Sequence, residues 1–173
     1  MTLQKLAELY KHQFIDCKYI IHTENNTLVL NGQPDNFMHL IGVEKYLPPN
    51  TKKAQFYYDC LNNKYSTIEN IINQMQEQDD KNMASIKSGY FYNIQNAIMQ
   101  ASDLYYTEEV EYGVCSDFKF KNKIKYHTVL FKYDNSLGFC IPKSNQVDKD
   151  IKYSNVIKYK YGKKPIIKIE IIK

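Results

Sequence analysis

Residues 36–43 of this 173-residue chain are Asn36-Phe37-Met38-His39-Leu40-Ile41-Gly42-Val43. The octet sets one histidine among large apolar residues and follows it closely with a glycine. Histidine has an unperturbed pKa near neutrality, so it can accept or donate a proton at little cost. The flanking residues predict a packed imidazole held in one orientation, and Gly42 permits a backbone bend or a close approach. A core histidine that makes one hydrogen bond and has no catalytic role fits the same pattern.

Helical patterns dominate the chain on both sides of this octet up to about residue 105. Apolar residues at spacings of three and four predict an amphipathic first helix. A hairpin with its turn at Glu24-Asn25-Asn26 follows it. The capping-box pattern Ser66-Thr67-Ile68-Glu69 predicts the start of another helix. The predicted helices span residues 2–14, 39–46, 50–61, 66–78 and 81–105, and the hairpin spans 17–31.

After Glu109 the apolar period changes from helical to alternating. Strands are predicted over 110–115, 118–121, 123–133, 138–142 and 165–172, with a turn at Asp134-Asn135-Ser136. Early helices and late strands predict an α+β fold, in which N-terminal helices pack on a mainly C-terminal antiparallel sheet.

Composition narrows the class of protein. The length suits one domain with a sizeable core. No apolar run is long enough for a membrane span, and the N-terminus lacks a signal-peptide core, so we expect a cytoplasmic protein.

The four cysteines are widely spaced without a C-x-x-C pair, which argues against a zinc site and against disulfides. We therefore expect no metal and no cofactor. The cysteines are Cys17, Cys60, Cys115 and Cys140.

Charge is distributed unevenly along the chain. All 23 cationic residues are lysines, so the chain has no arginine guanidinium that could form bidentate hydrogen bonds with a phosphate. Residues 1–110 carry a net charge of −4 and residues 111–173 a net charge of +8. The basic half predicts an anionic partner. Lysines that merely solvate one face of a sheet would give the same composition.

The octet, extended by Asp35, resembles the F-x-H-L-x-G signature of a small nuclease group. This group is the phage and mobile-element branch of the barnase, EndoU, colicin and RelE-like ribonucleases, called the BECR fold. The order of the elements is also similar, from the first helix and hairpin through the motif to helices at Phe56-Tyr57 and Ser66. Late in the chain, Leu137-Gly138-Phe139 and Pro142-Lys143-Ser144 resemble the group's terminal strand and Pro-x-Ser element. We assign residues 1–146 to this nuclease domain and 147–173 to a basic C-terminal strand extension of it.

The resemblance implies RNA cleavage without a metal ion. A general base takes the proton of a ribose 2′-hydroxyl, a general acid protonates the leaving 5′-oxygen, and cations stabilise the phosphoryl oxygens. His39 matches the motif and is the expected base or acid, and Ser144 lies in the matched Pro-x-Ser element. From chemistry alone, Lys143 is a candidate phosphate contact and Tyr58 and Ser66 are candidate helpers. The missing arginine departs from ribonucleases that clamp phosphate with one.

Two further stretches mix lysine with aromatic residues. In Lys123–Tyr133, alternation puts Lys123, Lys125 and His127 on one face. Stacking and phosphate attraction on such a face can hold single-stranded RNA, so we expect Lys125 and the adjacent Tyr126 to bind substrate, and His127 to be a second proton-transfer group. A half-exposed strand histidine with no task is the alternative. The second stretch, residues 152–164, suits an RNA-facing strand pair, a basic extension or a lysine-protected edge strand.

Two classes of function remain open on the sequence alone. The first is a phage or mobile-element ribonuclease acting as a toxin or host-takeover effector, with RNA as substrate and an antitoxin or host protein as a further partner. The second is a non-catalytic phage inhibitor of the anti-CRISPR type, whose acidic N-terminal part mimics nucleic acid and blocks a host nucleic-acid-handling protein. A DNA- or RNA-binding regulator is less supported, because no helix-turn-helix or RNP-like signature is present.

Overall fold

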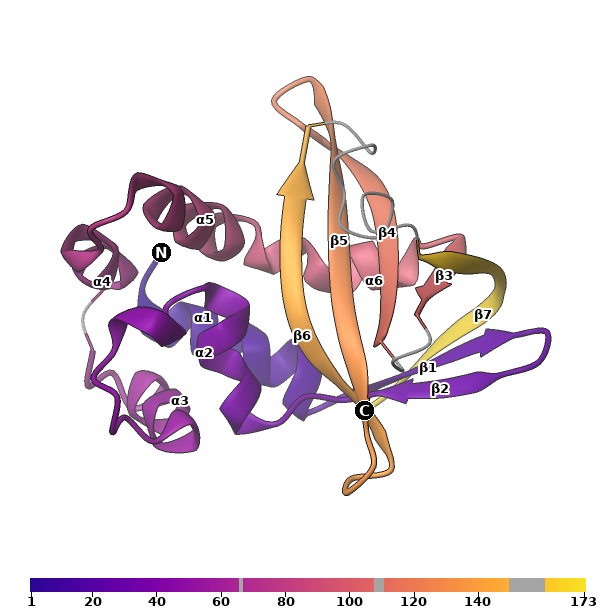
Figure 1. Cartoon of the computed structure of the whole chain (residues 1–173), viewed down its shortest axis with the longest axis horizontal. Coiled ribbons are helices and arrows are strands. Elements are labelled where there is room, and N and C mark those ends of the chain that lie inside the picture. Colours follow the sequence, from indigo (N-terminus) through magenta and orange to yellow (C-terminus); the bar gives the residue numbers. More distant parts are fainter. Residues whose placement is uncertain (66, 108–110, 150–160) are drawn as a thin grey trace.

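A computed structural model describes residues 1–65, 67–107, 111–149 and 161–173 of the chain (Figure 1). Its helical part lies to one side of a strongly bent sheet. The α-helices are α1 (Leu3–Tyr10), α2 (Phe37–Ile41), α3 (Lys53–Leu61), α4 (Ile68–Gln74), α5 (Gln78–Gly89) and α6 (Ile94–Met99). Shorter turns are η1 (Lys11–Ile15), η2 (Pro34–Asn36), η3 (Glu44–Tyr46) and η4 (Phe91–Asn93). The strands are β1 (Lys18–Thr23), β2 (Thr27–Leu30), β3 (Asp103–Tyr106), β4 (Glu111–Phe120), β5 (Lys123–Asp134), β6 (Phe139–Asp148) and β7 (Gly162–Ile172).

The strands close into a barrel in the order β1-β2-β6-β5-β4-β3-β7. Neighbours are antiparallel except β2 and β6, which meet in parallel at Leu30 and Cys140. The α+β class is thus confirmed, but the sheet is mixed where an antiparallel one was predicted, and it includes the N-terminal strands β1 and β2 besides the five C-terminal ones. The N-terminal hairpin completes the barrel because β1 pairs with β7 from Lys18 to Thr23. Such long-range pairing leaves no local trace in the sequence.

The predicted helix over 81–105 is also wrong as a single element. α5 ends at Gly89, the chain turns through η4 into the short α6, and β3 begins at Asp103. β3 is held on both sides, by β4 at Leu104–Val114 and by β7 at Asp103–Pro165. Two strand partners override the helical spacing of the apolar residues in this segment, as tertiary contacts often override propensity.

The core lies between the helices and the inner face of the bent sheet. Aromatic rings of η1, α2, α3 and η4 gather around Tyr10 of α1, with ring centroids 5.4–6.4 Å from its own. In Figure 1, α6 crosses behind β4 and β5 and covers them. The Asn145 amide of β6 donates a 2.6 Å hydrogen bond to the Leu40 carbonyl and so ties the sheet to α2. The helix that carries His39 is thereby fixed to the barrel.

None of the helices in the described ranges has the length and apolarity that a membrane crossing requires.

Candidate active site

The short helix α2 places His39 at the surface. Phe37, Met38, Leu40 and Ile41 are all buried, so His39 is the one residue of the helix that faces outward. The His39 side chain is 50 % exposed. The prediction of a packed imidazole is therefore wrong, because the apolar neighbours anchor the helix and leave the ring free of the core.

Gly42 allows α2 to lie directly against α5. It ends α2 in the left-handed conformation with φ of 79°, which glycine adopts without strain. A Cβ atom at this position would lie 3.2 Å from both the Ala84 Cα and the Lys87 Cδ. The expectation of a backbone bend and a close approach is thus confirmed, and the segment approached is α5.

The orientation of the His39 ring is set by Glu44, at the start of η3. The Nδ1 atom lies 2.9 Å from Glu44 Oε2, while Lys53 of α3 forms an ion pair with Oε1. The hydrogen bond from Lys53, and then the one from His39, lower the pKa of the Glu44 carboxyl. An ionised carboxylate only accepts hydrogen bonds, so Nδ1 carries the hydrogen. In the neutral ring Nε2 is then an acceptor, and no group in the described ranges hydrogen-bonds to it.

His39 opens into a pocket of about 480 Å³ between α2, η3 and α5. Lys87 contributes a side chain whose residue is only 6 % exposed. Burial, and then the positive charge of Lys45, lower the pKa of the Lys87 ammonium. Buried, unpaired lysines are costly and concentrate at functional sites. The lining residues are His39, Gly42, Glu44, Lys45, Tyr46, Asp80, Met83 and Lys87.

Sequence reasoning missed Lys87, Lys45 and Glu44. A weak signal was available for Lys87, because Asp80, Met83 and Lys87 follow each other at spacings of three and four on α5. What joined them to His39 is the packing of α5 on Gly42, which connects residues about 45 positions apart.

His127 of β5 is far less accessible than predicted. Its residue is 0 % exposed, and its Nδ1 lies 3.3 Å from the Asn93 amide nitrogen in η4. Burial lowers the pKa of His127 to about 4, and the nearby Asn145 side chain only partly opposes this. The expectation that His127 faces RNA is wrong, because η4 and α6 cover this part of the strand.

Ser144 and Lys143 lie on the wrong face of β6 to join His39. Ser144 pairs with Leu130 and shares its face, whereas the next residue, Asn145, points toward α2. Lys143 occupies a bulge between the paired residues and forms an ion pair with Glu111. The structure thus places neither residue in the His39 pocket.

The remaining predicted substrate contacts are scattered. Tyr58 is 48 % exposed on α3 but does not line the His39 pocket. Lys125 lies with its Nζ 4.7 Å from the Tyr90 ring centre, whereas Tyr126 points to the other face of the hairpin, opposite Asp117 and Asp148. Ser66 and residues 152–160 of the lysine–tyrosine stretch lie outside the described residues.

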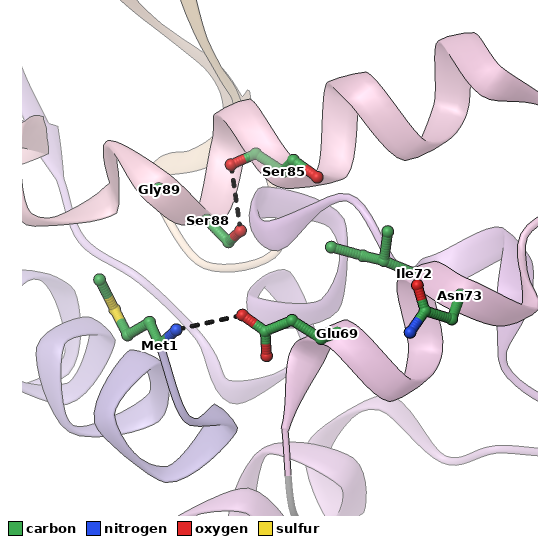
Figure 2. A pocket seen from close by; sticks show the side chains of 7 residues that line it. All are labelled: Met1, Glu69, Ile72, Asn73, Ser85, Ser88 and Gly89. Atoms are coloured by element: carbon green, nitrogen blue, oxygen red, sulfur yellow. Dashed lines mark hydrogen bonds and ion pairs between the residues drawn. The ribbon is translucent and has the colours of Figure 1, made fainter.

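A second pocket lies on another face of α5, next to α4 (Figure 2). Its charged pair and one of its hydroxyls are already engaged. The ammonium of Met1 lies 3.2 Å from Glu69 Oε1, and the Ser88 hydroxyl donates to the Ala84 carbonyl at 2.8 Å. The His39 pocket differs in offering an oriented histidine nitrogen and two lysines, so it is the better candidate for chemistry.

The oriented histidine, the lysine-lined pocket and the α+β barrel together fit a small nuclease. A family model described as phage-Barnase-EndoU-ColicinE5/D-RelE like nuclease4 matches residues 2–169. The chain therefore belongs to this phage-type BECR nuclease family, which confirms the predicted family. The match extends to residue 169, beyond residue 146, at which the sequence analysis ends the nuclease domain. No curated protein and no solved structure matches the chain significantly.

Proposed function

We propose that the protein is a metal-independent endoribonuclease whose active site is the His39 pocket. One observation carries the proposal: Glu44 fixes Nδ1 of His39, no described residue hydrogen-bonds to Nε2, and the histidine lines a pocket together with Lys45 and Lys87. A proton-transfer histidine needs this arrangement, with one nitrogen oriented and the other available to substrate. Membership of a nuclease family supports a phosphodiester substrate.

The proposed reaction is a transesterification within the RNA. His39 Nε2 takes the proton of a ribose 2′-hydroxyl, and the 2′-oxygen attacks the adjacent phosphorus. The bond from phosphorus to the 5′-oxygen breaks, leaving a 2′,3′-cyclic phosphate and a free 5′-hydroxyl. The leaving oxygen requires a proton, and Lys87 is placed to supply it, because its lowered pKa makes its ammonium a stronger acid than that of an exposed lysine.

The charges of the pocket favour this mechanism over one based on a metal ion. Cations already lie where a phosphate would bind, in Lys45 and Lys87. Of the two carboxylates in the lining, Glu44 is engaged by Lys53 and His39, which leaves Asp80 alone as a hard oxygen ligand. Magnesium sites in nucleases usually use several carboxylates or substrate phosphates, so lysines are the simpler means of stabilising the transition state here.

The test compares RNA and DNA of the same sequence in the presence of EDTA. We expect the protein to cleave the RNA and to leave the DNA intact, because DNA lacks the attacking 2′-hydroxyl. Intact RNA under these conditions would contradict the proposal. Intact RNA together with a stoichiometric host protein that co-purifies would favour the non-catalytic inhibitor.

We further propose that the nuclease is a toxin or host-takeover effector that acts in the cytoplasm. The phage type of its family supports this role. Expression of the wild-type chain in bacteria should stop growth, and the His39→Ala variant at equal abundance should not. Equal toxicity of the two proteins would separate any toxic effect from cleavage.

A further inference from the structure

The far end of the β4–β5 hairpin carries a cluster of aromatic and cationic side chains. Strand register places Phe118 opposite Lys125 and Phe120 opposite Lys123, so all four share one face. Tyr90, at the C-terminal end of α5, packs edge-on against the two phenylalanines with ring centroids 5.7 and 5.2 Å away. We call these five residues the hairpin cluster.

This face of the hairpin is open only at its far end. Further along the same face of β5, His127, Val129 and Phe131 are fully buried beneath the helices. Lys123 is exposed, and Lys125 is half-buried with its Nζ 4.7 Å from the Tyr90 ring centre. The predicted RNA-facing strand is therefore divided into a core segment and an accessible cationic end.

Charge on the hairpin differs between its two faces. In the segment from Asp117 to Tyr126, the single acid is Asp117, which lies on the opposite face together with Lys119 and Tyr126. Asp148 pairs with Tyr126 on that opposite face. The hairpin cluster thus presents positive charge beside aromatic rings, while the opposite face mixes both signs. The first combination suits an anionic partner that also carries flat apolar rings.

The cluster and the His39 pocket share α5. Asp80, Met83 and Lys87 form one stripe of α5 that lines the pocket, and Tyr90 follows Lys87 at the next spacing of three. At 1.5 Å rise per residue, Lys87 and Tyr90 are roughly 4.5 Å apart along the helix axis. A strand bound in the pocket could therefore pass along α5 directly onto the hairpin.

We propose that the hairpin cluster binds single-stranded RNA beyond the cleaved bond. The inference rests on the proposed ribonuclease function. Lys123 and Lys125 attract phosphates, and a base replaces Lys125 on the aromatic faces. This exchange is favourable because an exposed cation–π contact contributes roughly two- to fivefold in affinity. A stacked base contributes roughly five- to a hundredfold.

The first test measures binding in the His39→Ala background, where RNA is not consumed. The ligand is a labelled single-stranded RNA of about twelve nucleotides, within the usual site sizes of such surfaces. Phe120→Ala should weaken binding by about five- to a hundredfold, because a stacking ring is lost. The matched control is Ile124→Ala, which removes a 54 % exposed apolar side chain from the opposite face. Equal affinities for the two variants would overturn the proposal, once melting curves show that both are folded.

The second test separates the lysines by face. Lys123→Ala should lower the salt dependence of binding, with the slope of log affinity against log salt falling by about 0.7 for one lost phosphate contact. Lys119→Ala makes the same charge change on the opposite face and should leave the slope unaltered. Equal slopes for the two variants would overturn the proposal.

The outcome for this surface is distinguishable from that for the nuclease. If the wild type cleaves RNA in EDTA but the paired variants do not differ, the proposed RNA-binding role of the hairpin cluster is rejected and the proposed ribonuclease activity stands. If the protein binds RNA through the hairpin cluster but cleaves no RNA, the RNA-binding role stands and the proposed ribonuclease activity is rejected.

Discussion

Two Lys–Glu–His triads, one in the helical part and one on the barrel, have the same composition but different surroundings. In the helical part, Lys53 and His39 both contact Glu44. On the barrel, Lys168 and His22 both contact Glu170, at 3.0 and 3.1 Å. Both histidines are partly exposed, and in both triads the contacts of the lysine and the histidine lower the pKa of the glutamate. Composition alone therefore does not distinguish a site from a surface network.

The difference lies in the second ring nitrogen. His22 uses both nitrogens, with Nδ1 3.1 Å from Thr27 Oγ1 and Nε2 3.1 Å from Glu170 Oε1. Among the residues that the structure describes, His39 is hydrogen-bonded through Nδ1 alone, and its side chain lines a pocket that also contains Lys45 and Lys87. A histidine held at one nitrogen and open at the other can exchange a proton with a ligand, whereas one held at both is structural. The two triads therefore provide a matched pair for testing function.

The largest expected effect separates the two histidines. His39→Ala should reduce RNA cleavage by about a thousandfold, within the range for loss of a proton-transfer group. His22→Ala removes the same chemical group from the barrel triad and should leave the cleavage rate within about twofold. Single-turnover rates at saturating enzyme measure both. Equal losses would show that the triads are not functionally different.

A third histidine, His127, should affect stability instead of chemistry. Its pKa of about 4 lies below the ordinary value of 6.5 because the neutral ring is buried. Between about pH 6.5 and pH 4, the His127 ring is therefore protonated in the unfolded chain but neutral in the folded chain. The free energy of unfolding falls as the pH falls through this window. The loss is about 3 kcal/mol at most.

Urea unfolding of the wild type and of His127→Gln across this window measures the difference. The variant should lack this part of the acid destabilisation, whereas His22→Ala should keep it. Parallel curves for wild type and His127→Gln would contradict the assigned burial.

Lys87 should show opposite effects on activity and stability. Lys87→Met keeps the aliphatic packing against Gly42 but removes the buried charge. We expect cleavage to fall by about ten- to a hundredfold through loss of an acid or phosphate cation. The melting temperature should stay the same or rise, because the variant no longer buries an ammonium that no described residue pairs with. Lys168→Met in the barrel triad is the control and should not reduce cleavage. Unchanged cleavage in Lys87→Met would remove Lys87 from the mechanism.

The smallest effect concerns the glycine that brings α5 to the pocket. Gly42→Ala and Gly138→Ala both place a side chain at positive φ, near 79° and 74°. Of these two glycines, Gly42 has neighbours within 4 Å of the added Cβ and Gly138 has none. Each variant should lose about 1–2 kcal/mol from backbone strain, and Gly42→Ala about 1 kcal/mol more from overpacking. If both variants lose the same free energy of unfolding in chemical denaturation, α2 and α5 accommodate the added methyl group without destabilisation, which contradicts this prediction.

Local patterns predicted the features that local chemistry controls. The octet identified His39 as a candidate and Gly42 as a point of close approach, and the turn at Glu24-Asn25-Asn26 predicted the hairpin of β1 and β2. The family resemblance drawn from the octet is confirmed. These features depend on residues next to each other in the chain, so the sequence carries them directly.

The partners of His39 depend on contacts that sequence spacing does not encode. Lys87 reaches the site because α5 packs on Gly42, and Glu44 because the chain turns back through η3. The bulge at Lys143 reverses which residues of β6 face the helices, so that Asn145 and not Ser144 approaches α2. The cover over His127 comes from η4 and α6, in a segment whose spacing predicted one long helix.

The chemical nature of the RNA ends after cleavage in EDTA tests the central claim most directly. Transesterification at the His39 pocket predicts a 2′,3′-cyclic phosphate on one fragment and a 5′-hydroxyl on the other. It also predicts no cleavage where the nucleotide before the broken bond carries a 2′-deoxyribose. Cleavage that persists at the 2′-deoxy position, or that yields 5′-phosphate ends and requires a divalent metal ion, would contradict the assignment.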